Sequence, residues 1–290
     1  MEQLLHQIAS GLATGGVYAS LALALVMIYQ ATHHVNFAQG ELAMCSTYLA
    51  WSLVNKGAPY WLAFLVTVTV SFGVGVGIER VLIRKVEKAS VLTVVIVFIG
   101  MQFILNSVAG WIFGYTIQTF PSPFPEAPPF DNPYINSHEL GIVGVTFLVV
   151  VLLWAFFRFT SAGLALRGAA ANAESAALCG IRVGSMLALG WGLASAIGAV
   201  AGMLIAPVVF LDPNMMSGIL IYAFAAALLG GIDSPVGAVV GGFSLGVLEN
   251  LAGAYLIGTE LKLTVALVTI IAVLVVRPSG LFGKVVVTRV

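Results

Sequence analysis

Long runs of apolar residues, interrupted by short polar or glycine- and proline-rich segments, make up most of this chain. The runs extend over about 20 residues without polar–apolar alternation, which is typical of helices that cross a bilayer. The second and seventh runs are short for a full crossing, which predicts tilted, broken or re-entrant helices buried among the others. The predicted spans are Ser10–Gln30, Gly40–Val54, Tyr60–Ile78, Val91–Gly114, Gly141–Phe157, Ser185–Pro207, Gly218–Gly231, Val236–Ile257 and Leu263–Val276.

Composition excludes the main alternatives to a helical membrane protein. The 290 residues are 60% hydrophobic and 8% charged, and the 12 Lys and Arg balance the 12 Asp and Glu. A soluble domain has roughly 25% charged residues, because its surface must be polar. A disordered chain needs low hydrophobicity, and a nucleic-acid-binding protein needs a basic surface. An outer-membrane barrel needs alternating segments of roughly ten residues, which these uniform runs do not provide.

The positions of Lys and Arg predict the orientation in the membrane. All but two of the twelve lie in the segments 79–90, 158–184 and 277–290, and the proline-rich segment 115–139 contains none. Because basic residues concentrate in cytoplasmic loops, the segments 79–90, 158–184 and 277–290 are expected on the cytoplasmic side of the membrane. The segment 115–139 is expected on the external side. The C-terminus is therefore expected in the cytoplasm.

Glycines recur at four-residue spacing within the predicted helices. This spacing lets helix backbones approach each other closely in lipid and predicts tight packing. The pairs are Gly11/Gly15, Gly73/Gly77, Gly198/Gly202, Gly237/Gly241 and Gly242/Gly246.

The segment Arg167–Ile181 predicts a short helix on the cytoplasmic side. Asn172 suits the N-cap position and Glu174 the first turn, where the helix dipole favours a carboxylate. Gly180 suits the position that ends a helix in left-handed conformation. Two interpretations remain open at this point: a helix that inserts into a cytoplasmic partner, or a surface helix without one.

Two groups of polar residues interrupt the apolar pattern. Asn36, Gln39 and Glu41 lie where the first span ends and the next helix begins, where they either cap that helix or line the inner mouth of a pathway. Glu249 and Asn250 lie inside a predicted span, where an ionisable group costs about 2.5–3.5 kcal/mol on insertion scales. They either line a pathway or form buried interhelical hydrogen bonds. The pathway interpretation predicts that Glu249→Leu impairs transport without loss of expression.

The sequence contains no convincing pattern for catalysis, nucleotide binding or metal binding. Gly242-Phe243-Ser244-Leu245-Gly246 matches a nucleophile pattern, but it lies within a predicted membrane helix, where packing explains its glycines. Gly280–Lys284 has the wrong spacing for a nucleotide-binding P-loop. The histidines and the two cysteines form no metal-ligand pattern. We therefore expect no catalytic residues, no metal and no P-loop ATPase activity on this chain.

Four segments resemble permease subunits of ABC importers for branched-chain amino acids, and they do so in the same order along nearly the whole chain. Besides the Arg167–Ile181 loop, the resemblance includes a Val-Asn-Phe-Ala-x-Gly-Glu element and a Gly-Gly-x-x-Ser-Pro-x-Gly-Ala element. Gln39 stands where that family usually has His. The other three segments are Gly11–Leu23, Val35–Glu41 and Ala223–Ala238.

The resemblance implies an all-α polytopic permease fold of the importer type, with about 8–9 transmembrane helices in a single domain, residues 1–290. The loop at 115–139 would be external and the loop at 159–184 would couple to the ATPase. The expected location is the bacterial inner membrane. The expected partners are a second homologous permease, two cytoplasmic ATPase subunits that bind the ATP, a periplasmic substrate-binding protein and membrane lipid, with no nucleic acid.

The resemblance also implies roles for individual residues. The ATPase pair would push on the cytoplasmic helix and drive alternating access for branched-chain or other apolar amino acids. The alternatives are an ABC permease for small amides or urea, or a secondary transporter or channel for a small solute. The coupling residues would be Arg167, Asn172, Glu174, Ala177, Gly180 and Ile181, and the pathway candidates Asn36, Gln39, Glu41, Glu249 and Asn250.

Overall fold

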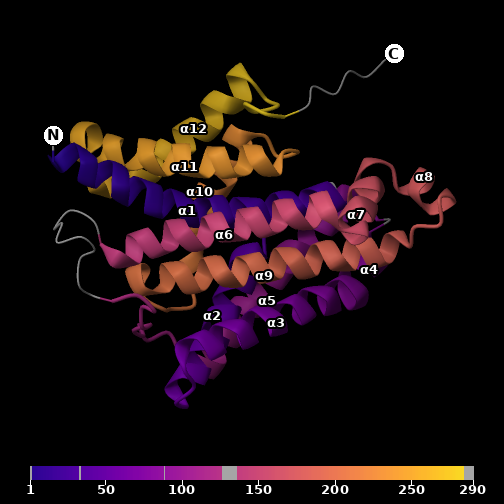
Figure 1. Cartoon of the computed structure of the whole chain (residues 1–290), viewed down its shortest axis with the longest axis horizontal. Helices are drawn as coiled ribbons and strands as arrows, with labels where there is room; N and C mark the ends of the chain where they lie inside the picture. The colour runs from indigo at the N-terminus through magenta and orange to yellow at the C-terminus, as the bar shows by residue number, and fades with distance from the viewer. Residues whose placement is uncertain (1, 33, 88, 126–135, 284–290) are drawn as a thin grey trace. The chain divides into compact units, whose positions relative to one another are not determined.

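The computed structural model describes residues 2–32, 34–87, 89–125 and 136–283, and these residues are predominantly helical. Figure 1 shows the helices as ribbons. Their bounds are α1 Glu2–Thr32, α2 Gln39–Asn55, α3 Tyr60–Ile78, η1 Glu79–Ile83, α4 Arg84–Val86, α5 Val91–Phe113, α6 Ser137–Phe159, α7 Ser161–Ala171, α8 Ala173–Leu178, α9 Val183–Val209, α10 Met215–Gly230, α11 Pro235–Ala252, η3 Gly253–Ile257, η4 Thr259–Leu261 and α12 Lys262–Val276.

All nine predicted spans form helices. In the described part of the chain, seven helical segments are long and apolar enough to cross a membrane. The other two spans are α2, with 17 residues, and α10, with 16. At 1.5 Å per residue such helices are shorter than the roughly 30 Å hydrocarbon core. The prediction that these two spans are short is confirmed.

The chain forms two compact units, and each mixes early and late segments. The first comprises Met1–Val26, Phe124–Thr146 and Gly218–Val290, and the second comprises Met27–Pro123 and Phe147–Ser217. The long helices α1 and α6 each contribute one part to the first unit and one part to the second.

In the first unit, α1 and α11 pack through glycines. A Cβ atom at Gly11 would lie 2.8 Å from the Val247 Cα, and one at Gly15 would lie 2.9 Å from the Gly242 carbonyl oxygen. These backbones are therefore in direct contact, as the spacing of small residues predicts. Further along α11, Gly241 packs against α10, where its Cβ would lie 2.8 Å from the Gly230 amide nitrogen.

The first part of α6 joins this unit through hydroxyl groups. Thr146 donates a hydrogen bond to the Gly16 carbonyl oxygen at 3.2 Å, and its hydroxyl lies 3.3 Å from that of Ser20. Both Thr146 and Ser20 are buried. Such bonds connect transmembrane helices where no hydrophobic driving force separates protein from lipid.

The second unit is built around α9, which is buried along most of its length. On one side, α2 packs against Gly198 and Gly202 of α9. A Cβ at Gly202 would lie 2.8 Å from the Ala43 carbonyl oxygen. On another side α9 packs against α3. The predicted glycine pairs are therefore confirmed on α1, α9 and α11.

Gly73 and Gly77 of α3 do not pack against another helix of this chain, because nothing in its described residues lies within 4 Å of a Cβ at either position. The close approach of α3 to α9 uses other glycines. A Cβ at Gly75 would lie 2.5 Å from the Trp191 carbonyl oxygen, and one at Gly192 would lie 2.8 Å from the Phe72 ring. Spacing alone therefore does not identify which glycines of a helix face a partner.

Within the loop expected outside, residues 115–125 are not helical, whereas residues 137–139 already belong to α6, which begins at Ser137. Gln118 pairs with Leu211 through two backbone hydrogen bonds of 2.9 Å, so this loop is fixed to the α9–α10 connection. Prolines at 128, 129 and 133 lie outside the described residues, and so do Lys88, Lys284 and Arg289, which contributed to the predicted orientation.

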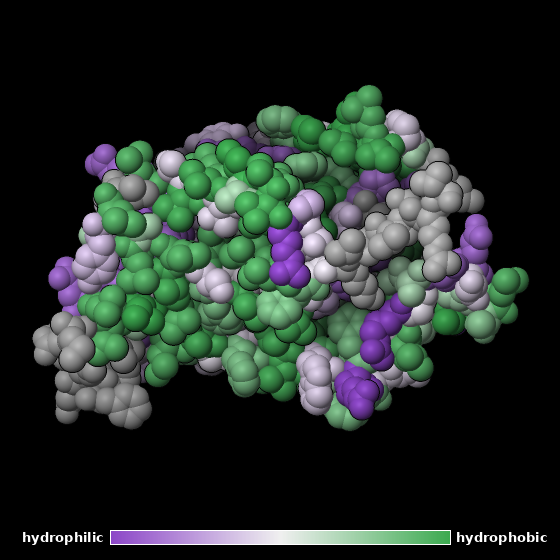
Figure 2. All heavy atoms as spheres, turned by 90° about the horizontal axis from the view of Figure 1, so that it is seen from above, coloured by the Kyte–Doolittle hydropathy of each residue, from purple (hydrophilic) through white to green (hydrophobic). Residues whose placement is uncertain are grey.

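Large apolar side chains cover the outer faces of several helices. Trp111 of α5 and Val276 of α12 are 85% and 82% exposed. Of the seven helical segments long enough to span a membrane, α6 and Thr259–Val276 are the least buried. Figure 2 shows one face of the molecule on which hydrophobic residues predominate. A surface of this kind is stable only against lipid or another apolar surface.

Candidate functional site

The helix α8 lies in the loop between α6 and α9 and is capped at both ends. The Asn172 side-chain oxygen accepts a hydrogen bond from the Ser175 amide at 2.9 Å, which caps the N-terminus as predicted. At the other end, Gly180 has φ +83°, and the Ile181 amide donates to the Ala176 carbonyl oxygen at 3.0 Å. This is a Schellman ending, which the glycine predicts.

The loop contains two helices rather than one continuous helix from Arg167 to Ile181. Asn172 has extended backbone geometry and separates α7 from α8. Its side chain bonds to Ser175 within α8, which favours a helix start over continuation of α7. Arg167 therefore belongs to α7, whereas Glu174 and Ala177 lie in α8.

The surface of α8 is strongly exposed. Among its six residues only Ala176 is buried, and Leu178 at its end is 90% exposed. An isolated exposed leucine is ordinary, but here it stands beside exposed alanines on a helix with both ends fixed. The arrangement presents a preformed short helix to the solvent.

A second group of polar residues lies where α2 begins. Asn36 accepts from the Ala38 amide at 3.0 Å and donates to Gln39, while Gln39 donates to the Ala194 carbonyl oxygen at 3.0 Å. Asn36 and Gln39 are completely buried. The side chains stabilise the turn and its contact with α9, but none of them caps the first turn of α2.

The turn before α2 lies beside the middle of α9. Ala194 lies near the middle of α9, so α2 begins beside the middle of that helix rather than beside either end. If α9 crosses the bilayer, the non-helical segment before α2 lies at membrane depth. Such a segment is tolerated only when protein buries it, as it does here.

Glu41 follows in the first turn of α2 and is buried. Its Oε2 accepts a hydrogen bond from Asn106 of α5 at 3.5 Å, and the same amide donates to the Pro213 carbonyl oxygen at 2.7 Å. Asn106 therefore joins α2, α5 and the α9–α10 connection. Asn106 is not among the residues predicted from the sequence, although a lone asparagine in an apolar span was a usable signal.

The third group lies in the first unit, around Glu249 of α11. The carboxyl group is buried and forms a side-chain hydrogen bond with Tyr18 of α1. The Tyr18 ring stacks on that of Tyr222 of α10, with centroids 4.8 Å apart. In the described part of the chain, the second carboxyl oxygen of Glu249, Oε2, has no hydrogen-bond partner.

Asn250 connects this group to α12. Its side chain accepts from the Lys262 ammonium at 2.5 Å and donates to the Thr14 hydroxyl at 3.4 Å. The Lys262 stem passes over Gly253, where a Cβ would lie 2.9 Å from the Lys262 Cε. Asn250 is thus an interhelical hydrogen-bonding residue. Tyr18, Tyr222 and Lys262 were not selected from the sequence, because only the fold brings them to α11.

The Gly242–Gly246 segment lies inside α11, and its glycines face α1. Ser244 is therefore on a regular helix, not on the sharp strand-to-helix turn that a nucleophilic serine of this pattern needs. Helix packing therefore explains the glycines of this motif, as predicted from the sequence.

The chain is similar to permease proteins along nearly its whole length. It is 33% identical to the high-affinity branched-chain amino acid transport system permease protein LivH of Escherichia coli K12, covering 97% of this chain and 96% of that protein. It is 32% identical to BraD of Pseudomonas aeruginosa, with the same coverage, and 30% identical to a probable LivH of Methanocaldococcus jannaschii, covering 91% and 87%.

Among solved structures, PsaBC from Streptococcus pneumoniae in complex with Fab is similar with a TM-score of 0.49 and 14% identity, covering 93% of this chain and 91% of that chain. The family described as "Branched-chain amino acid transport system / permease component" matches residues 7–274. The chain belongs to this permease family.

Proposed function

We propose that this chain is the transmembrane permease subunit of an ATP-binding cassette importer that moves branched-chain amino acids across the bacterial inner membrane. The observation that carries the proposal is the family match over residues 7–274. The relatives are named as permeases for these amino acids, and the match includes all nine helical spans apart from the first five residues of α1 and the last two of α12.

The geometry of α8 supports coupling to an ATPase subunit. Asn172 and the Gly180 turn fix both ends of α8, so it does not have to fold when a partner binds, which lowers the entropic cost of association. Its exposed Leu178 and neighbouring alanines suit insertion into an apolar cleft. In this proposal two cytoplasmic ATPase subunits bind ATP, and their closure pushes on α8.

Glu249 is the pathway candidate with the strongest physical support. A buried carboxyl oxygen without a partner is costly in an apolar interior, so its retention needs a compensating role. The ammonium group of an amino acid in transit would supply the missing partner. Asn36, Gln39 and Asn250 have partners that explain them structurally, and Glu41 sits in a first turn, where the helix dipole favours a carboxylate.

The remaining partners follow from the same assembly. A second permease subunit would cover part of the apolar surface of the outer helices, and lipid would cover the rest. A periplasmic binding protein would deliver the amino acid to the external side, and the C-terminus would lie in the cytoplasm. No cofactor is assigned to this chain itself.

The assembly can be tested by affinity purification of this chain after co-expression with candidate ATPase, permease and binding-protein genes from the same genome. The proposal predicts a stable complex whose ATP hydrolysis is stimulated by the loaded binding protein. If this chain instead purifies as a stable transporter without ATPase subunits, and an ion gradient drives leucine through it, the importer assignment is wrong.

A further inference from the structure

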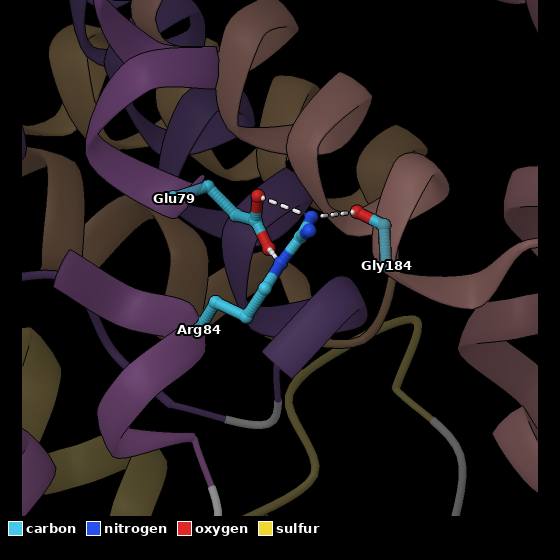
Figure 3. Close-up of polar contacts among 3 residues, drawn as sticks. All are labelled: Glu79, Arg84 and Gly184. Atoms are coloured by element: carbon cyan, nitrogen blue, oxygen red, sulfur yellow. Dashed lines mark hydrogen bonds and ion pairs between the residues drawn. The ribbon is translucent and has the colours of Figure 1, made fainter. Parts of the chain in front are cut away.

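Glu79 and Arg84 form an ion pair at the end of α3 where the basic segment 79–90 begins. Arg84 Nε donates to Glu79 Oε1 at 3.1 Å and Nη2 donates to Oε2 at 2.9 Å, so the guanidinium meets both carboxylate oxygens (Figure 3). The Glu79 side chain is only 1% exposed, whereas Arg84 is 45% exposed. Paired hydrogen bonds of this kind fix orientation as well as charge.

A local change of helix type makes this pair possible. In an α-helix, residues five apart point in directions about 140° apart, so the two side chains would diverge. Residues Glu79–Ile83 instead form a π-helical turn, and the Arg84 amide donates to the Glu79 carbonyl oxygen. The wider turn places residue 84 over residue 79. Single π-turns inside α-helices occur frequently at functional sites.

Arg84 also connects α3 with the start of α9. Its Nη2 donates to the Gly184 carbonyl oxygen at 2.8 Å, as Figure 3 shows. Gly184 is the second residue of α9, which begins directly after the Schellman ending of α8. A Cβ at Gly184 would lie 3.3 Å from the guanidinium, so glycine gives Arg84 room to approach this backbone.

Above this contact, α3 and α9 are packed backbone to backbone. Gly75 lies against Trp191 and Ser195, and Gly192 lies against Phe72 and Val76. Close-packed surfaces of this type resist sliding and transmit displacement from one helix to the other. The Arg84 contact extends this rigid pairing to the end of α3 nearest α8.

We propose that Arg84 is a positioning residue that links the α8–α9 junction to α3, so that a displacement of α8 moves α3 and α9 together. This rests on the proposed function, because the displacement would come from the ATPase subunits. Without the Arg84 contact, the end of α3 near residue 84 would not have to follow a displacement of the first turn of α9. The bidentate pair with Glu79 holds the guanidinium in an orientation in which Nη2 also reaches the Gly184 carbonyl oxygen.

The test compares Arg84→Lys with Arg80→Lys in the assembled transporter in proteoliposomes. Lysine keeps a positive charge beside Glu79 but lacks the planar fork that contacts two oxygens and a carbonyl together. Arg80 is exposed in the same π-turn and provides the matched control. ATP hydrolysis and uptake of radiolabelled leucine are measured together, and their ratio is the readout.

We expect Arg84→Lys to lower leucine transported per ATP by about threefold or more, which is within the range by which single residues change coupling between sites. ATPase activity and assembly should remain, and Arg80→Lys should keep the wild-type ratio. A purely structural role of Arg84 would reduce the amount of assembled complex but leave the ratio of that complex unchanged.

Gly184→Ala provides a second variant, because it crowds the guanidinium without changing any charge. If Arg84→Lys does not assemble, the ratio in Gly184→Ala decides the question. An unchanged ratio in the assembled variants would overturn this proposal. By contrast, a wild-type complex that shows no ATP-dependent leucine uptake would contradict the proposed function itself.

Discussion

Gly15 of α1 and Gly242 of α11 are in direct backbone contact. A Cβ atom at Gly15 would lie 2.9 Å from the Gly242 carbonyl oxygen and 2.9 Å from the Phe243 Cα. Real side chains do not approach backbone atoms this closely, so any larger residue must separate the two helices. This contact fixes α11, and with it Glu249, against α1.

Gly15→Val is therefore expected to destabilise the protein by about 1–3 kcal/mol, the cost of overpacking a close contact. The measurement is thermal unfolding of the purified protein in detergent. Gly73→Val is the matched control, because Gly73 has the same four-residue glycine spacing but nothing within 4 Å of a Cβ. Equal melting temperatures of the two variants would show that the α1–α11 contact does not limit stability.

Removal of the α8 cap should weaken binding to the ATPase subunit. Asn172→Ala deletes the acceptor for the Ser175 amide, which costs about 1 kcal/mol of helix stability. Hydrogen exchange should accelerate at Ser175, and less ATPase should co-purify. Asn172→Asp keeps a capping oxygen and serves as the control. If Asn172→Ala binds the ATPase as well as Asn172→Asp does, the capped α8 helix is not the docking element.

Replacement of Glu249 by glutamine and by leucine distinguishes substrate recognition from a structural role of its side chain. Glutamine keeps a hydrogen-bonding partner for Tyr18 but loses the charge, whereas leucine loses both. If the carboxylate meets the ammonium group of the amino acid, Glu249→Gln should lower leucine uptake by about tenfold or more, because hydrogen bonds to charged groups are worth about 1.5–3 kcal/mol.

Glu249→Leu should impair uptake at least as strongly while expression is maintained. The measurement is initial uptake rate normalised to the amount of protein in the membrane. Wild-type uptake in Glu249→Gln together with lower protein stability in Glu249→Leu would assign Glu249 a structural role between α1 and α11.

Asn106 should be important for stability rather than for charge recognition. Asn106→Leu leaves the Pro213 carbonyl oxygen without this donor and removes the bond to Glu41, which should cost about 1–3 kcal/mol. Thermal unfolding measures the loss. Ile104→Leu, at an exposed position of the same helix, is the control. Equal stability of the two variants would mean that another donor replaces Asn106.

The parts of this structure that sequence predicts well depend on local signals. Nine apolar runs give nine helices, and their lengths identify α2 and α10 as short. The ends of α8 were predictable because Asn172 and Gly180 act through hydrogen bonds within three to five residues of themselves. Glycine pairs were predictable as a class, because close backbone approach requires small residues.

The contacts that could not be predicted from the sequence join residues whose neighbours are set by helix packing or by an unusual helical turn. Gly75 and Gly192 pack α3 against α9 although neither belongs to a predicted pair, because helix rotation decides which glycine faces the neighbour. Arg84 meets Glu79 only through a π-turn, which hydrophobic periodicity does not reveal. Tyr18 reaches Glu249 only after α1 and α11 have packed.

The most direct test of the account is leucine uptake into proteoliposomes that contain this chain with its partner permease and ATPase subunits. We predict uptake that requires ATP on the ATPase side and the binding protein on the other side, and that does not change when ion gradients are dissipated. Uptake that continues without ATP and follows an ion gradient would contradict the account.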